Sequence, residues 1–196
     1  MDGIARKSRI IFGMSGTLKG TTIKKMYSDS PDHFILWSDT KLFFEADRNL
    51  FSWQARLLGP SIATSRLIYL QRYIPREKLI VCERGVTDFL FPLPTYKLSG
   101  LESYDKMDIP EITRRENEYI RSNGYDIVRT LLVMKDRNFI MNNVLKGSDS
   151  THRVSLYPEV DSYLSSQDEY VEFTCKYNKI DEIIEITDAW DYISKL

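Results

Sequence analysis

A short stretch near the N-terminus has the residue types and the spacing that bind phosphate. The apolar run RIIFG leads into MSGTLKGTT, and Gly13 lies six residues before Lys19, as in the phosphate-loop pattern G-x-x-x-x-G-K-[ST]. Leu18 stands where that pattern has its second glycine, and Gly20 stands where it has Ser or Thr. A strand that turns into a helix here directs backbone N–H groups and the positive end of the helix dipole at one point. We therefore expect a phosphate site.

This loop offers both backbone and side-chain ligands to a nucleotide. Lys19 is expected to neutralise charge on the outer phosphates, and Thr21 offers a hydroxyl to a Mg²⁺ site. The expected nucleotide-binding residues are Gly13, Met14, Ser15, Gly16, Thr17, Leu18, Lys19, Gly20 and Thr21. The alternative is a glycine-containing turn between a strand and a helix that holds no ligand.

An acidic and a basic residue follow another apolar run, LIVC. Glu83 can hold the water shell of Mg²⁺ beside the phosphate loop. Arg84 can clamp an acceptor or stabilise charge during a transfer. The alternative is a surface ion pair at the end of a strand, which contributes little.

Asp39 follows a further apolar run, HFILW. A carboxylate at this point can accept the proton of a hydroxyl acceptor during phosphoryl transfer, whereas a phosphate acceptor needs no such base. The alternative is a helix cap before the segment LFFEA. The sequence leaves both roles open for Asp39.

The elements that must position these residues alternate along the chain. Short apolar runs predict buried parallel strands at residues 9–13, 33–37, 78–83, 129–135 and 181–187. Amphipathic segments predict helices at residues 19–28, 61–73, 110–123, 137–145 and 161–176. Alternation of this kind predicts an α/β fold with a parallel sheet and helices on both faces. Because ligands of such sheets bind at the carboxyl ends of the strands, the candidate residues belong at one edge.

Composition narrows the class of protein. The chain has 196 residues, which fits a single domain over residues 1–196. Its net charge of −1 gives no global field that would draw it to nucleic acid or to a membrane surface. Two cysteines do not make a disulfide framework, and we see no membrane segment or signal peptide. We therefore expect a cytoplasmic protein.

In the order and spacing of these motifs, the chain resembles the thymidylate kinase and deoxynucleoside kinase group of P-loop kinases, from about residue 8 to about residue 190. Glu83-Arg84 is similar to the Glu-Arg pair that deoxynucleoside kinases carry after their third strand, and Lys-Gly-Thr is similar to the loop of adenylate kinases. The resemblance implies a three-layer fold with a five-stranded parallel sheet in the order 2-3-1-4-5. It also implies transfer of the γ-phosphate of ATP, with Mg²⁺, to a pyrimidine deoxynucleotide-type acceptor.

The resemblance also implies roles for single residues. Arg66 would hold the phosphate of the acceptor, and Phe43 and Trp53 would lie where the acceptor base stacks. Residues from about 137 to 160 would form a lid over the donor phosphates, with Arg153 in the lid and Arg137 at its start. The implied catalytic residues are Lys19, Asp39, Glu83, Arg84 and Arg153. The alternatives are a solvated helix residue for Arg66, ordinary core packing for the two rings and a solvated loop for the lid.

The acceptor stays open, because the chain has neither the Arg-Glu-Pro nor the Asp-Arg-Tyr segment of thymidylate kinases. In this respect it resembles a diverged, phage-type branch, which would act in the host cytoplasm. One alternative is therefore a kinase that phosphorylates 5-hydroxymethyluracil in DNA during thymidine hypermodification, with DNA as a partner. Another is a non-catalytic nucleotide-binding switch, which Leu18 and Gly20 suggest. The resemblance also allows a homodimer.

Overall fold

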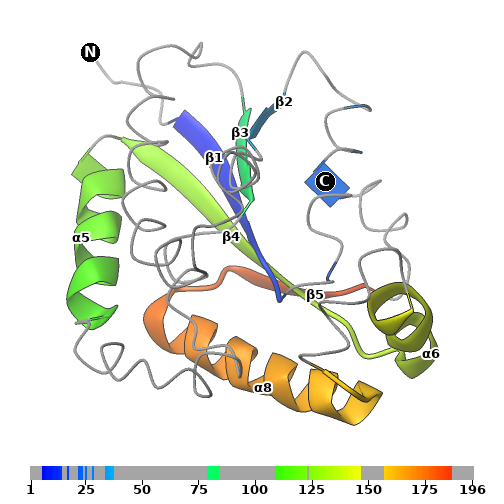
Figure 1. Cartoon of the computed structure of the whole chain (residues 1–196). Helices are drawn as coiled ribbons and strands as arrows, with labels where there is room; N and C mark the ends of the chain where they lie inside the picture. The colour runs from blue at the N-terminus through cyan, green and yellow to red at the C-terminus, as the bar shows by residue number, and fades with distance from the viewer. Residues whose placement is uncertain are drawn as a thin grey trace, which may run out of the picture.

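The strands follow the apolar runs of the sequence, and they pair in parallel. The structure is a computed structural model that describes residues 6–14, 17, 22–23, 25, 28, 34–37, 79–83, 109–122, 124–146 and 157–186. Within those residues, one sheet has the strand order β2-β3-β1-β4-β5 (Figure 1). Its strands are β1 Arg6–Phe12, β2 Phe34–Trp37, β3 Leu79–Glu83, β4 Tyr125–Val133 and β5 Glu182–Glu185. The predicted parallel sheet with helices is confirmed.

Both faces of the central strands are covered. Ile10, Ile11 and Phe12 are consecutive in β1, and all three are buried. Leu131 and Leu132 of the neighbouring strand β4 are buried as well. Successive side chains of a strand point to opposite faces of the sheet. Burial of consecutive residues therefore explains why the strands are continuous apolar runs rather than alternating ones.

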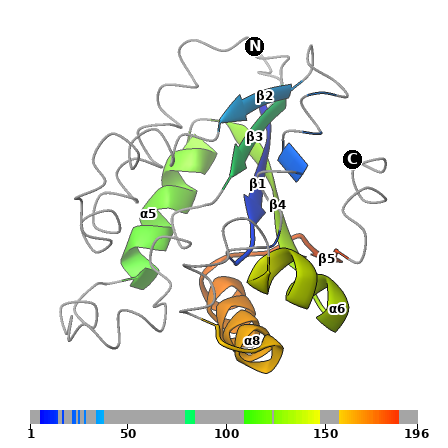
Figure 2. The same cartoon turned by 45° about the vertical axis from the view of Figure 1, so that its right-hand side comes forward.

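Two long helices cover one of these faces. They are α5 Ile109–Ser122 and α8 Val160–Tyr177. The connections from β3 to β4 and from β4 to β5 step across the sheet in the same direction, so right-handed crossovers place both helices on the same face. Figure 2 shows α5 and α8 on one side of the sheet. The connection from β1 to β2 steps the opposite way, which predicts a helix on the other face. Of the predicted helix in that segment, Thr22, Ile23, Lys25 and Ser28 are described; all four are helical, and Thr22 and Ile23 are buried.

The main core lies between the sheet and α8. Tyr157 packs edge-on against Tyr163, with 5.3 Å between the ring centroids. Both tyrosines belong to the hydrophobic core cluster. Its other buried residues come from the ends of β1 and β4, from the segments that follow these strands, and from α8: Ile10, Phe12, Met14, Leu131, Val133, Met134, Ile140, Val144, Leu145, Val160 and Tyr170. The core therefore extends to the carboxyl edge of the sheet, where the candidate site begins.

The segment after β4 is helical over the residues that the sequence predicts, but it changes type. It starts as α6 Arg137–Phe139 and continues as the π-helix η3 Ile140–Leu145. The Asp136 carboxylate caps it by accepting a hydrogen bond of 2.9 Å from the Phe139 N–H. A π-helical turn inside a helix frequently marks a functional segment.

A polar network joins three strands on the face opposite to α8. The Thr130 hydroxyl donates to the Glu182 carboxylate at 2.6 Å and accepts from the Arg9 guanidinium at 2.8 Å. Arg9 also pairs with Glu182. Because these residues come from β1, β4 and β5, the network favours one register of the three strands.

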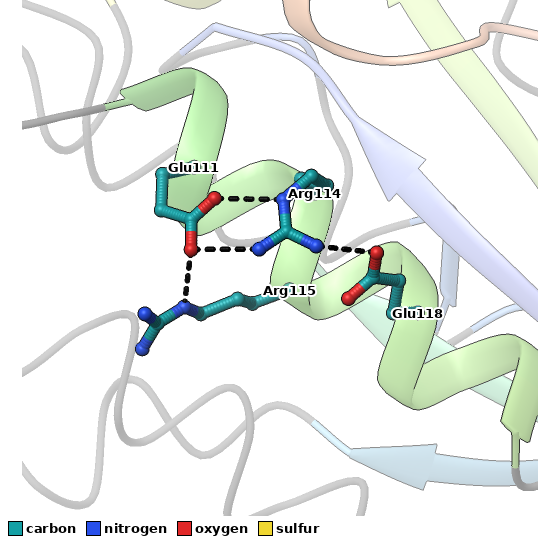
Figure 3. A network of polar contacts seen from close by, with 4 residues as sticks. All are labelled: Glu111, Arg114, Arg115 and Glu118. Carbon is teal, nitrogen blue, oxygen red and sulfur yellow. Dashed lines mark hydrogen bonds and ion pairs between the residues drawn. The ribbon is translucent and has the colours of Figure 1, made fainter.

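The outer surface of α5 carries a second polar network, made of Glu111, Arg114, Arg115 and Glu118 (Figure 3). Arg114 donates to both oxygens of the Glu111 carboxylate at 2.7 and 2.8 Å, and Arg115 donates to it at 2.7 Å. These bonds, first from Arg114 and then from Arg115, lower the pKa of Glu111 to about 2. Residues three and four apart meet on a helix surface, so this network marks the solvated face of α5. None of the described helices could cross a lipid bilayer.

Candidate functional site

The described part of the site is the turn that follows the central strand β1. Gly13 comes directly after Phe12 and has a φ of +157°. A Cβ on Gly13 would overlap the Thr17 hydroxyl oxygen and would lie 3.3 Å from the carbonyl oxygen of Leu132. Only glycine fits this backbone conformation without strain. The absence of a side chain at Gly13 therefore lets the chain fold back over the end of the sheet.

Thr17 closes the turn from inside. Its N–H and its hydroxyl both donate to the carbonyl oxygen of Met14, at 3.2 and 2.8 Å. Both residues are buried. A bond from residue i+3 to the carbonyl of residue i is typical of a tight turn. The turn is thus held by the protein's own bonds.

The helix α8 contacts the first residue of this turn. The hydroxyl of Tyr170 accepts a hydrogen bond of 3.1 Å from the Gly13 N–H. Tyr170 is 3% exposed, so the bond lies inside the core. The N–H of Gly13 consequently points at α8.

The same face of α8 holds the end of the neighbouring strand. The Gln167 side-chain amide accepts from the Met134 N–H and donates to the Met134 carbonyl, both at 2.8 Å. The hydroxyl of Tyr163 contacts the Met134 sulfur at 3.8 Å. Met134 follows β4 directly. One helix therefore fixes the carboxyl ends of both β1 and β4.

Glu83 is the last residue of β3, and its backbone is described. Its register partner is Ile11 of β1. The carboxyl end of β3 therefore lies beside the end of β1 and next to the turn that starts at Gly13. This is the edge at which a parallel sheet binds its ligands.

The remaining predicted site residues lie outside the described part of the chain. They are Ser15, Gly16, Leu18, Lys19, Gly20 and Thr21 of the loop, and Asp39, Phe43, Trp53, Arg66, Arg84 and Arg153. Their roles stay predictions. The structure thus brings together Gly13, Met14 and Thr17, with the backbone of Glu83 on the adjacent strand.

Arg137, at the start of the predicted lid, forms a two-pronged ion pair with Asp161. Its two terminal nitrogens lie 2.6 and 3.0 Å from the two carboxylate oxygens. The hydrogen bonds raise the pKa of Arg137 and lower the pKa of Asp161. Asp161 is in the first turn of α8. The pair therefore joins the two ends of the segment predicted as a lid.

One observation bears on whether the turn suits a nucleotide. Thr22 has a buried hydroxyl with no hydrogen-bond partner in the described part of the chain. Buried hydroxyls are usually satisfied by protein or by a bound group. This hydroxyl fits a phosphate ligand near the start of the helix, whereas the space beside Gly13 is filled by the Thr17 hydroxyl and shapes the turn.

No cluster of three or more His, Cys, Asp or Glu residues that could hold a metal ion occurs within the described ranges. Mg²⁺ in phosphate sites keeps several waters and needs only one or two protein ligands besides the phosphates. The carboxyl end of β3, which carries Glu83, lies at the correct edge for one such ligand.

Sequence reasoning missed the contributions of Tyr170 and Gln167. The only local signal is their spacing, because Tyr163, Gln167, Tyr170 and Thr174 follow one another at helical intervals and are all buried. That spacing predicts one buried helix face. It does not tell which strand ends the face contacts.

Comparison with known proteins places the chain by its fold. No protein-family model matches the sequence, and no curated protein matches it. Thymidylate kinase from Candida albicans is similar in structure, with a TM-score of 0.56 at 15% identity, over 98% of this chain and 90% of that one. Thymidylate kinase from Ehrlichia chaffeensis has a TM-score of 0.51 at 12% identity, over 97% and 95%.

Shikimate kinase from Bacteroides thetaiotaomicron is also similar, with a TM-score of 0.50 at 12% identity, over 97% of this chain and 96% of that one. At these identities the likeness concerns the fold alone. The chain has the fold of P-loop kinases.

Proposed function

We propose that the chain is a P-loop kinase that moves the γ-phosphate of ATP to a pyrimidine deoxynucleotide-type acceptor, as thymidylate kinases do. The observation that carries the proposal is the turn from Gly13 to Thr17. It follows the central strand at the carboxyl edge of the sheet, in a chain with the fold of P-loop kinases. Phosphate groups bind where a strand turns into a helix at this edge.

The hydrogen bonds of the turn divide its residues by role. The N–H of Gly13 donates to Tyr170, and the N–H of Thr17 donates to Met14. These two amides therefore shape the loop. In the proposal, the phosphates are held by the ammonium of Lys19 and by the other backbone N–H groups of the loop, those of Ser15, Gly16, Leu18, Gly20 and Thr21.

Bound ATP would bring the transferable phosphoryl group, and Mg²⁺ would offset the charge of the phosphates. Thr21 and Glu83 are the proposed residues that hold the metal, through water. Arg84 and Arg153 would stabilise negative charge at the transferring group. These roles rest on the position of β3 beside β1 and on the order of the motifs in the sequence.

The acceptor is the least constrained part of the proposal. Two of the similar structures are thymidylate kinases and one is a shikimate kinase. Proteins of this fold therefore differ in their acceptors, and the fold by itself does not identify the acceptor of this chain. A pyrimidine nucleotide is favoured by Arg66, Phe43 and Trp53, which match the places where the resembling kinases hold the acceptor's phosphate and base.

We also propose that residues 1–196 form one kinase domain with a lid at about residues 137–160. The ion pair between Arg137 and Asp161 supports the lid, because it closes the base of this segment. The π-helix η3 supports it too, since such turns are frequent at functional sites. A homodimer stays a prediction of the resemblance.

A second candidate function is phosphorylation of 5-hydroxymethyluracil in DNA. The absence of the Arg-Glu-Pro and Asp-Arg-Tyr segments favours it. So does Asp39, because a hydroxyl acceptor needs a base to take its proton.

The test is transfer of radiolabelled γ-phosphate from ATP to a panel of acceptors. The panel holds thymidine, thymidylate, the other deoxynucleoside monophosphates, and duplex DNA with and without 5-hydroxymethyluracil. Label on a pyrimidine monophosphate supports the proposal. Label only on the modified DNA supports the second candidate. Bound ATP with no label on any acceptor overturns both and favours a nucleotide-binding switch.

A further inference from the structure

Tyr170 occupies a particular position on the buried face of α8. It bonds to the phosphate loop, whereas Gln167 and Tyr163 on the same face bond to Met134 after β4. Its partner, the Gly13 N–H, is separated from it by 157 residues of sequence and is buried. A buried backbone donor needs an acceptor, and Tyr170 supplies one where the ladder of β1 ends.

Resting on the proposed function, we propose that Tyr170 is a positioning residue for the nucleotide. By accepting the Gly13 N–H, its hydroxyl fixes the first residue of the phosphate loop relative to α8. The orientation of Gly13 then sets the direction of the turn that Thr17 closes onto Met14. Fixing these described residues before the ligand arrives leaves less of the loop to be ordered when the ligand binds.

The physical reason is preorganisation. A ring that is 3% exposed is locked by its neighbours, so its hydroxyl is a fixed acceptor rather than a mobile one. A loop that is already ordered loses less conformational entropy when a ligand binds. When only part of the population has a binding-competent loop, the apparent affinity falls by that fraction.

The test compares two isosteric changes on one helix face. Tyr170→Phe removes the hydroxyl that holds Gly13. Tyr163→Phe removes a buried hydroxyl about two helical turns away, which contacts the Met134 sulfur. For each purified full-length variant, the measurements are the Kd of MgATP by calorimetry, the KM for ATP, kcat with the acceptor identified from the panel, and the melting temperature.

We expect Tyr170→Phe to raise the Kd and the KM for ATP by about threefold to tenfold, the effect of one hydrogen bond. Its kcat should stay within about twofold, because the bond does not act on the reacting atoms. Tyr163→Phe should leave the Kd unchanged, although both variants lose some thermal stability. If Tyr170 had a merely structural role, Tyr170→Phe would lower the melting temperature but would not raise the KM for ATP while kcat stays nearly unchanged.

The outcomes separate this inference from the proposed function. A folded wild-type chain that binds no MgATP overturns the proposed function and the inference with it. A wild-type chain that binds MgATP, together with Tyr170→Phe that binds it equally well, overturns the inference alone.

A second measurement needs no variant, in case Tyr170→Phe does not fold. If the Tyr170–Gly13 bond favours nucleotide binding, nucleotide binding must favour the bond by the same factor. In wild-type protein labelled with ¹⁵N-glycine, MgATP should therefore slow hydrogen exchange of the Gly13 amide by about threefold to tenfold. Exchange at the rate of an unprotected amide, or no response to MgATP by a chain that binds it, contradicts the inference.

Discussion

The hydroxyl of Thr17 lies where a side chain on Gly13 would begin. The two residues are therefore matched: Gly13 has no Cβ, and Thr17 uses the space to bond to the Met14 carbonyl. The phosphate-loop pattern has glycine at this place. In this chain any other residue would place its Cβ against the Thr17 hydroxyl. A substitution at either residue should disturb the other.

Gly13→Ala should destabilise the fold by about 1–3 kcal/mol, because the added methyl overlaps Thr17 and the φ disfavours residues with a Cβ. It should also weaken MgATP binding by at least about tenfold, since the turn is displaced. Urea unfolding and calorimetry measure the two effects.

Gly124→Ala is the matched control for this change. Gly124 also has a positive φ, of +70°, but among the described residues no atom other than those of its chain neighbours lies within 4 Å of the position of its Cβ. It should lose about 1 kcal/mol of stability from backbone strain and keep its affinity for MgATP. Equal losses of MgATP affinity in the two variants would argue against a special role for Gly13.

Gln167→Leu tests how firmly α8 holds the end of β4. The change leaves the N–H and the carbonyl of Met134 without their side-chain partner inside the core. Each buried unsatisfied group costs about 1–3 kcal/mol, so we expect a loss of about 2–5 kcal/mol in the free energy of unfolding.

Glu169→Gln, at an exposed position of the same helix, should change the free energy of unfolding by less than about 0.5 kcal/mol. If Gln167→Leu were as stable as this control, the two bonds to Met134 would have no energetic weight.

The central strands could be predicted from the sequence because β1 and β4 are buried on both faces and are therefore local apolar runs. The edge strand β5 is less buried, and its Ile183 is 54% exposed. The apolar run predicts a strand from Arg129, whereas β4 begins at Tyr125. Its first residues include the exposed Asp126, yet they pair with Arg6 and Lys7 of β1. These first residues of β4 are extended because they pair with the central strand β1, not because they are apolar.

In the candidate site, too, features with a local sequence pattern could be predicted and features that depend on long-range packing could not. The glycine at position 13 could be singled out from its spacing to Lys19, because the phosphate-loop pattern is short-range. The role of Thr17 in closing the turn onto Met14 could not, since that position is variable in the pattern. The bonds from Tyr170 and Gln167 could not, since they depend on how α8 packs across the ends of β1 and β4. The change from α6 to a π-helix at Ile140 has no local signal that we recognise.

Asp39→Asn distinguishes the two kinds of acceptor. Loss of a base should lower kcat for a hydroxyl acceptor by about a hundredfold or more, because a hydroxyl must lose its proton during transfer. A phosphate acceptor is already ionised, so its kcat should fall by less than about tenfold. Transfer assays on thymidine and thymidylate measure the difference. Equal effects on both acceptors would make Asp39 a structural residue.

The network on α5 should make stability depend on pH at the acid end. Folding lowers the pKa of Glu111 from its ordinary value of 4.5 to about 2, through hydrogen bonds from Arg114 and Arg115. The folded state therefore binds fewer protons than the unfolded state between these values. The contribution of Glu111 is complete above about pH 4.5 and is lost as the pH falls towards 2.

Urea unfolding between pH 2 and pH 6 measures this contribution. Glu111→Gln should flatten the acid part of the profile, and high salt should reduce the difference between the two proteins, because the network is at the surface. Profiles of the same steepness in wild type and Glu111→Gln would show that Glu111 does not couple stability to pH.

The central claim is that the loop from Gly13 to Thr21 binds the phosphates of ATP, and the most direct measurement is calorimetric titration of MgATP into wild type and Lys19→Ala. We predict one MgATP per wild-type chain, with a Kd in the range that is typical of KM values for substrates, about 1 μM to 1 mM. Lys19→Ala, with an unchanged melting temperature, should bind at least about tenfold more weakly, because it loses a charged contact to phosphate. Equal affinity in the two folded proteins, or no binding by wild type, would contradict the account.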